Sequence, residues 1–122
     1  MKKILVIDDD AVVRDTIVQI LEGEGYSVVS AEDGMRGVAL FRSEHPDLVI
    51  TDIIMPEREG IQTITEIRGL VPAAKVIAIS GGGRIGNADF LQIARLLGAV
   101  DVISKPFDPD DFLSRVAYCL AA

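Results

Sequence analysis

Four aspartates stand directly behind apolar runs of the sequence, where their carboxylates could share a metal ion. Asp8, Asp9 and Asp10 follow the run ILVI, and Asp52 follows LVIT. Two unit charges about 4 Å apart repel each other by about 1 kcal/mol in water, and by several times more near a protein surface. Such a cluster persists when a cation relieves the repulsion. Oxygen ligands without histidine or cysteine indicate Mg²⁺ or Mn²⁺ rather than zinc.

A hydroxyl and an ammonium group follow two further apolar runs. Ser80 comes directly after VIAI, and Lys105 stands in the segment VISKPF. A carboxylate can attack phosphorus and form an aspartyl phosphate, and Mg²⁺ commonly recruits phosphate oxygens. Ser80 and Lys105 would then hydrogen-bond and neutralise the phosphoryl oxygens. These residue types therefore favour magnesium-dependent phosphoryl chemistry.

The elements that must position these residues alternate along the chain. Short runs rich in Val and Ile predict five strands, at 4–7, 26–30, 48–51, 76–79 and 100–103. Their continuous apolar character is typical of a parallel sheet that is covered on both faces. Helical periodicity between them predicts five helices, with starts at Asp10, Asp33, Asn87 and Asp108 and one stop at Gly25.

This alternation predicts an α/β fold, a doubly wound sandwich. In such folds, ligands bind at the carboxyl ends of the strands, where the connections switch sides of the sheet. The carboxylates, the hydroxyl and the ammonium group all follow strand ends. We therefore expect them to converge at one edge of the sheet.

Length and composition narrow the classes of function. The chain has 122 residues, which predicts a single domain over residues 1–122. Its 12 basic and 19 acidic residues give a net charge of −7, which argues against direct nucleic-acid binding. The apolar run near the N-terminus is too short for a signal peptide or a membrane span. The lone Cys119 cannot form an internal disulfide, which fits a reducing compartment. From these two observations together, we expect a cytoplasmic protein that does not bind membranes.

Taken in order, these motifs resemble those of response-regulator receiver domains, over nearly the whole chain. They are the acidic pair Asp8–Asp9, the segment TDIIMP with Asp52, the hydroxyl of Ser80, and KPF, which begins at Lys105. Each motif alone is weak, but the ordered set is specific. The resemblance implies a flavodoxin-like (βα)5 sandwich with a five-stranded parallel sheet in the order 2-1-3-4-5.

The resemblance also implies a metal site and a phosphoacceptor. Asp52 would accept the phosphoryl group. Asp9 and Asp52 would contact Mg²⁺ directly, helped by the backbone carbonyl of Ile54, and Asp8 would act mostly through a bound water. The implied donor is a phosphohistidine on a sensor histidine kinase or a histidine phosphotransfer protein. The chain would then be a signalling module rather than an enzyme, with a downstream target that the sequence does not name.

The implied switch involves the hydroxyl and the lysine. Ser80 would bind a phosphoryl oxygen and shift on phosphorylation, while Lys105 would pair with the phosphate. The output surface would comprise the glycine-rich loop after strand four, strand five and the last helix, and a homodimer could form on phosphorylation. The chain departs from the family at Val102, where receivers commonly carry Tyr or Phe. This departure puts the usual aromatic switch in doubt.

Two alternatives use the same residues differently. The segment VIDDDAV also matches the nucleophile motif of magnesium-dependent haloacid-dehalogenase-type phosphatases, with Asp8 as nucleophile and Asp10 as acid. That interpretation leaves Asp52 without a role, and the chain is short for the family. A pseudo-receiver that binds partners without phosphorylation is disfavoured because every expected acidic, hydroxyl and lysine position is filled. The simpler roles are a helix cap for Asp10, a core thiol for Cys119 and a surface loop for His45.

Overall fold

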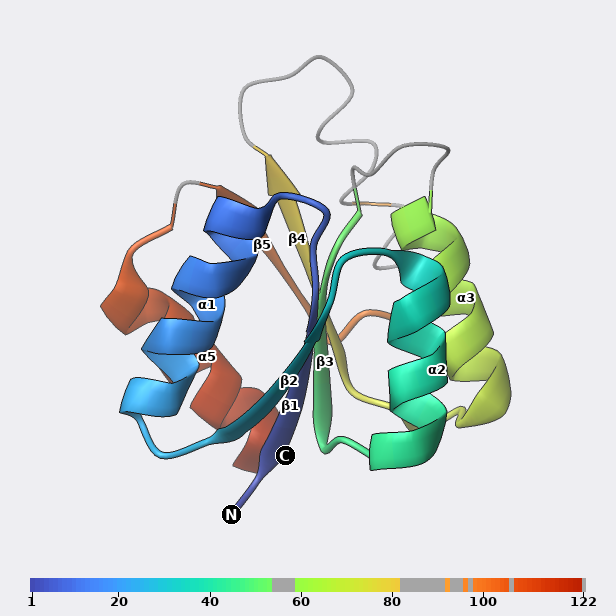
Figure 1. The fold of residues 1–122 in the computed structure, drawn as a ribbon, viewed down its shortest axis with the longest axis horizontal. Coiled ribbons are helices and arrows are strands. Elements are labelled where there is room, and N and C mark those ends of the chain that lie inside the picture. The colour runs from blue at the N-terminus through green and yellow to red at the C-terminus, as the bar shows by residue number, and fades with distance from the viewer. Residues whose placement is uncertain (54–58, 82–91, 93–95, 97, 106, 122) are drawn as a thin grey trace.

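The protein folds into one parallel sheet with helices on both faces (Figure 1). The computed structural model describes residues 1–53, 59–81, 92, 96, 98–105 and 107–121. The strands are β1 (Lys3–Ile7), β2 (Ser27–Ala31), β3 (Leu48–Asp52), β4 (Val76–Gly81) and β5 (Asp101–Lys105). The helices are α1 (Ala11–Gly23), α2 (Gly34–Glu44), α3 (Glu59–Leu70) and α5 (Pro109–Ala121). The helix expected to begin at Asn87 lies outside the described residues.

The sheet has the order β2-β1-β3-β4-β5, and every neighbouring pair is parallel. This order confirms the predicted doubly wound, flavodoxin-like topology. The chain leaves β1 toward one edge of the sheet and returns at β3 to build the other half. The connections therefore switch sides between β1 and β3, which is where this class of fold binds its ligands. Ile7 pairs with Thr51, so the next residues, Asp8 and Asp52, are neighbours at this point.

The core consists of two apolar layers, one on each face of the sheet. Successive residues of a strand point to opposite faces, so β1 contributes Ile4 and Val6 to one layer and Leu5 and Ile7 to the other. Helices α1 and α5 cover the first layer, and α2 and α3 cover the second (Figure 1). Because both faces are buried, the strands carry continuous apolar runs rather than an alternating pattern.

Three of the four predicted helix starts are confirmed by their hydrogen bonds. The Asp10 carboxylate accepts the amide of Val12 at 2.9 Å, and Asp33 accepts the amide of Arg36 at 2.7 Å. Asp108 accepts the amide three residues further on, at 3.0 Å. Each bond satisfies a backbone donor that has no partner inside its helix. Asp10 is thus the cap of α1, as expected.

Three further expectations concern single residues. Gly25 follows α1 with a φ of 92°, and its amide donates to the carbonyl of Glu22 at 3.0 Å, so it ends the helix as predicted. Cys119 is a residue of α5, and its side chain lies in the apolar layer that α1 and α5 cover. Burial raises the pKa of its thiol, which suits a core residue and not a reactive one. His45 follows the last residue of α2 and is exposed, as expected for a surface residue.

Candidate metal centre

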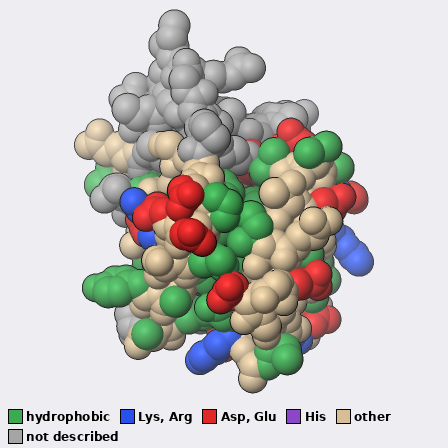
Figure 2. All heavy atoms as spheres, turned by 90° about the vertical axis from the view of Figure 1, so that its left-hand side faces the viewer, with side chains coloured by type: hydrophobic (Ala, Val, Ile, Leu, Met, Phe, Trp, Pro, Cys, Tyr) green, Lys and Arg blue, Asp and Glu red, His purple; other side chains and the backbone are tan. Residues whose placement is uncertain are grey.

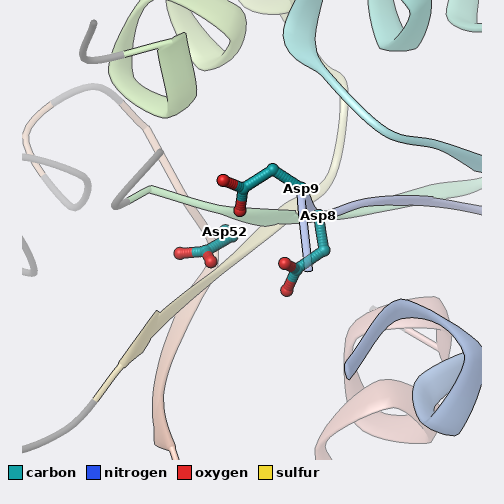
Figure 3. A group of neighbouring side chains, drawn as sticks. All are labelled: Asp8, Asp9 and Asp52. Carbon is teal, nitrogen blue, oxygen red and sulfur yellow. The ribbon is translucent and has the colours of Figure 1, made fainter. Parts of the chain in front are cut away.

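Three of the predicted site residues lie together at the carboxyl edge of the sheet. Asp8 and Asp9 follow β1, and Asp52 is the last residue of β3 (Figure 3). Each offers one carboxylate oxygen, and these oxygens all lie within 4.8 Å of one another. Asp8 and Asp52 are only 1% and 6% exposed, while Asp9 is exposed. The cluster therefore has a buried base and one side that is open to solvent.

Four hydrogen bonds hold the loop that carries Asp8 and Asp9. The Asp8 amide donates to the carbonyl of Ala31 at 3.1 Å, which ties the start of the loop to β2. The Asp8 carboxylate accepts the amide of Asp10 at 2.9 Å. Asp10 in turn caps α1. The guanidinium of Arg14, on α1, donates to the carbonyl of Asp8 at 2.8 Å. The loop is thus attached to a strand on one side and to a helix on the other.

The sheet itself positions Asp52. Asp52 pairs with Ile79 in the β3–β4 register, and the Ile53 amide donates to the Ile79 carbonyl at 2.9 Å. The hydroxyl of the buried Thr51 donates to the carbonyl of Asp52 at 3.1 Å. Hydrogen bonds between β3 and β4 therefore fix the backbone at Asp52, and its side chain projects from a rigid strand.

The donor set fits a hard divalent cation. Ligands of one octahedral Mg²⁺ lie about 2.1 Å from the ion, and hence roughly 3 to 4 Å from one another. The three carboxylates come close to that spacing, and small side-chain rotations would close the difference. The exposure of Asp9 leaves room for the water ligands that Mg²⁺ usually keeps. Asp8, Asp9 and Asp52 are thus the residues that would hold the ion, while Ile54 lies outside the described residues.

Ser80 and Lys105 lie on strands at the same edge, although only their backbone belongs to the described structure. Ser80 follows Ile79, the partner of Asp52, and Lys105 pairs with Gly81. The sequence places both residues directly behind their strands, whereas the structure includes them in β4 and β5. The reason is that the ladder of backbone hydrogen bonds continues beyond the last apolar side chain. Their contacts with a phosphoryl group stay predictions.

Two further residues, one on β5 and one on α1, concern the site. Val102 is 7% exposed and packs in the apolar layer that α2 and α3 cover, so a small core residue occupies this position of β5. Arg14 was not predicted as a site residue. The sequence does contain a signal for Arg14. A cation near the N-terminus of a helix interacts unfavourably with the helix dipole, which suggests that its side chain has a specific partner.

The charge of the surface agrees with the composition. Figure 2 shows the side of the molecule formed by α1 and α5, where acidic side chains cover more of the surface than basic ones. No helix among the described residues is both long enough and apolar enough to cross a membrane.

The sheet order and the acidic cluster at the switch point together define a doubly wound α/β domain with a candidate metal site at the carboxyl ends of its strands. The response regulator receiver domain family matches residues 4–117, and the chain belongs to this family. The resemblance proposed from the sequence is thereby confirmed. Receiver domains are signalling modules of two-component systems, and they generally bind Mg²⁺ through their acidic cluster.

The chain is similar to proteins of about its own length and to longer ones. The chain is 40% identical to the chemotaxis protein CheY of Treponema pallidum over 121 residues, which is 97% of this chain and 82% of that protein. It is 38% identical to the probable transcriptional regulator ycf27 of Porphyridium aerugineum, but spans only 46% of that relative. A receiver domain from Clostridium thermocellum superposes with a TM-score of 0.90 at 30% identity, over 99% of this chain and 95% of that one.

Proposed function

We propose that this receiver domain accepts a phosphoryl group on Asp52 from the phosphohistidine of a sensor histidine kinase or a histidine phosphotransfer protein. The observation that carries the proposal is the group of three carboxylates within 4.8 Å at the switch point of the sheet. An Asp52 oxygen attacks the phosphorus, the bond from phosphorus to the donor's imidazole nitrogen breaks, and an acyl phosphate forms. The imidazole leaves with the electron pair of that bond.

The remaining site residues prepare this transfer. Asp8, Asp9 and the carbonyl of Ile54 would hold Mg²⁺ beside Asp52, and the ion would offset the charge of the incoming phosphoryl oxygens. Ser80 would donate a hydrogen bond to one of those oxygens, and Lys105 would pair with another. Asp52 is nearly buried, so its acyl phosphate would be shielded from water on most sides. The chain thus acts as an acceptor that turns over slowly and not as a phosphatase.

The phosphorylated state would be transmitted through the edge formed by β4 and β5. Ser80 would follow the phosphate, and the surface made of the loop after β4, β5 and α5 would change with it. The loop itself, which is glycine-rich, lies outside the described residues. Because Val102 is a buried aliphatic residue, the proposed response depends on Ser80 and Lys105 and not on an aromatic side chain. A downstream protein, or a second copy of the chain, would bind the changed surface.

The phosphatase alternative fits the geometry less well. It needs Asp10 as a general acid close to a nucleophilic Asp8. The Asp10 carboxylate instead accepts the amides of Val12 and Val13 at the start of α1, at 2.9 and 3.3 Å. Proton transfer from Asp10 would require breaking this cap. Asp52 is also part of the cluster, and the alternative gives it no role.

Phosphorylation by a small donor tests the proposal. Incubation with acetyl phosphate and Mg²⁺ should add one phosphoryl group, detectable by intact-protein mass spectrometry, and EDTA should prevent the addition. Asp52→Asn should abolish it. Asp10→Asn is the matched control, since it removes a neighbouring charge while asparagine caps a helix equally well. If Asp52→Asn is phosphorylated like the wild type, Asp52 is not the acceptor.

A further inference from the structure

Arg14 connects α1 to the backbone of the acidic loop. Its guanidinium donates to the Asp8 carbonyl at 2.8 Å, six residues back along the chain. Its own amide donates to the Asp10 carbonyl at 2.9 Å, as the first turn of α1 closes. The side chain is half-buried. Arg14 therefore closes a ring that contains Asp8, Asp9 and Asp10.

The bond lies at the point where the chain leaves the sheet. The Asp8 amide still continues the ladder by donating to the Ala31 carbonyl, whereas the Asp8 carbonyl accepts from Arg14. Rotation of the peptide group between Asp8 and Asp9 would displace both of their side chains. Residues outside the ligand set that orient metal ligands typically affect metal affinity by a factor of about 10 to 100.

We infer that Arg14 is a positioning residue for the metal site, which holds the Asp8–Asp9 segment in the geometry that binds a divalent cation. This inference rests on the proposed function, since it concerns the same site. The positive charge of Arg14 has the opposite effect, because a fixed cation repels an incoming one. Removal of the guanidinium should therefore lower the Mg²⁺ affinity if positioning dominates, and raise it if charge repulsion dominates.

Magnesium titrations of three variants, followed by backbone amide NMR shifts, separate these roles. Arg14→Met keeps an apolar stem without donors, and we expect its Mg²⁺ affinity to fall by about tenfold. Arg14→Lys keeps the charge and a donor group on a shorter side chain, so its affinity should lie between those of Arg14→Met and the wild type. Arg36→Met is the matched control. Arg36 is an exposed residue of α2 whose guanidinium makes no hydrogen bond among the described residues, so its loss should not weaken binding.

Amide hydrogen exchange in EDTA gives a second measurement that does not need the metal. The Asp10 amide, which donates to the Asp8 carboxylate, should exchange faster in Arg14→Met than in Arg36→Met. If Arg14→Met binds Mg²⁺ as tightly as the wild type or more tightly, the positioning role is wrong and charge alone acts. If the wild type itself shows no Mg²⁺-dependent shifts at the cluster, the proposed function fails and this inference fails with it.

Discussion

At the scale of single residues, the carboxylates of Asp8, Asp9 and Asp52 are close enough to repel one another whenever no cation lies between them. Their types and places behind apolar runs made this cluster predictable from the sequence. The contact from Arg14 was not predictable in the same way. A long side chain can reach several places, and only the folded loop determines that its guanidinium meets the Asp8 carbonyl.

This repulsion should be measurable as stability. Asp52→Asn removes one of the three charges, so in EDTA the variant should be more stable than the wild type by about 1 kcal/mol. Mg²⁺ binds the native state alone, and at a hundred times its dissociation constant it should stabilise the wild type by about 2.7 kcal/mol. The variant should gain much less. Denaturant unfolding of both proteins, with EDTA and with Mg²⁺, gives these free energies.

The control for this prediction is Asp10→Asn, which keeps the helix cap and leaves the three ligands in place. Its response to Mg²⁺ should match that of the wild type. A loss of stability for Asp52→Asn in EDTA, or equal stabilisation of all three proteins by Mg²⁺, would show that the aspartates do not form a strained metal site.

At the scale of elements, the strands and the capped helix starts followed from apolar runs and from short polar side chains. The ends of β3, β4 and β5 did not, because backbone pairing extends through Asp52, Ser80 and Lys105 although these side chains are polar. The close approach of α2 to the sheet was also not predicted. A Cβ atom built on Gly37 would lie 2.8 Å from Cγ1 of Ile7, so only glycine fits there without a shift.

Two glycine substitutions test this packing. Gly37→Ala forces Ile7 or the helix to move, and overpacking of this kind costs about 1 to 3 kcal/mol, which outweighs the gain in helix propensity. At Gly69, near the end of α3, an added Cβ atom would meet nothing within 4 Å, so Gly69→Ala should stabilise by up to about 1 kcal/mol. Urea unfolding of both variants gives the sign. A stabilising Gly37→Ala would disprove the close contact between α2 and β1.

At the scale of the whole molecule, the parallel sheet followed from the sequence pattern, but its strand order came from the family resemblance. Periodicity indicates which segments are strands, and it does not indicate which strands are neighbours. In the observed order, β3, which ends at Asp52, lies between β1 on one side and β4 and β5 on the other. In the proposed mechanism, a signal from Asp52 toward α5 would cross β4 and β5, through the segments that hold Ser80 and Lys105.

Variants of these two residues should separate phosphorylation from the response. Lys105→Ala removes the charge partner of the phosphate, and Ser80→Ala removes a hydrogen-bond donor, so each should still accept some phosphoryl group but respond less. The response is the change in amide hydrogen exchange of β5 and α5 when beryllofluoride and Mg²⁺ are added. Equal exchange in the wild type with and without beryllofluoride would rule out a switch through this edge.

The position of the phosphoryl group tests directly whether Asp52 is the acceptor. The protein is phosphorylated with acetyl phosphate and Mg²⁺, the acyl phosphate is reduced with borohydride, and peptides are sequenced by mass spectrometry. We expect the reduced residue to be Asp52 and no other aspartate to be modified. A modification at Asp8 would contradict this expectation, because Asp8 is the nucleophile of the phosphatase alternative.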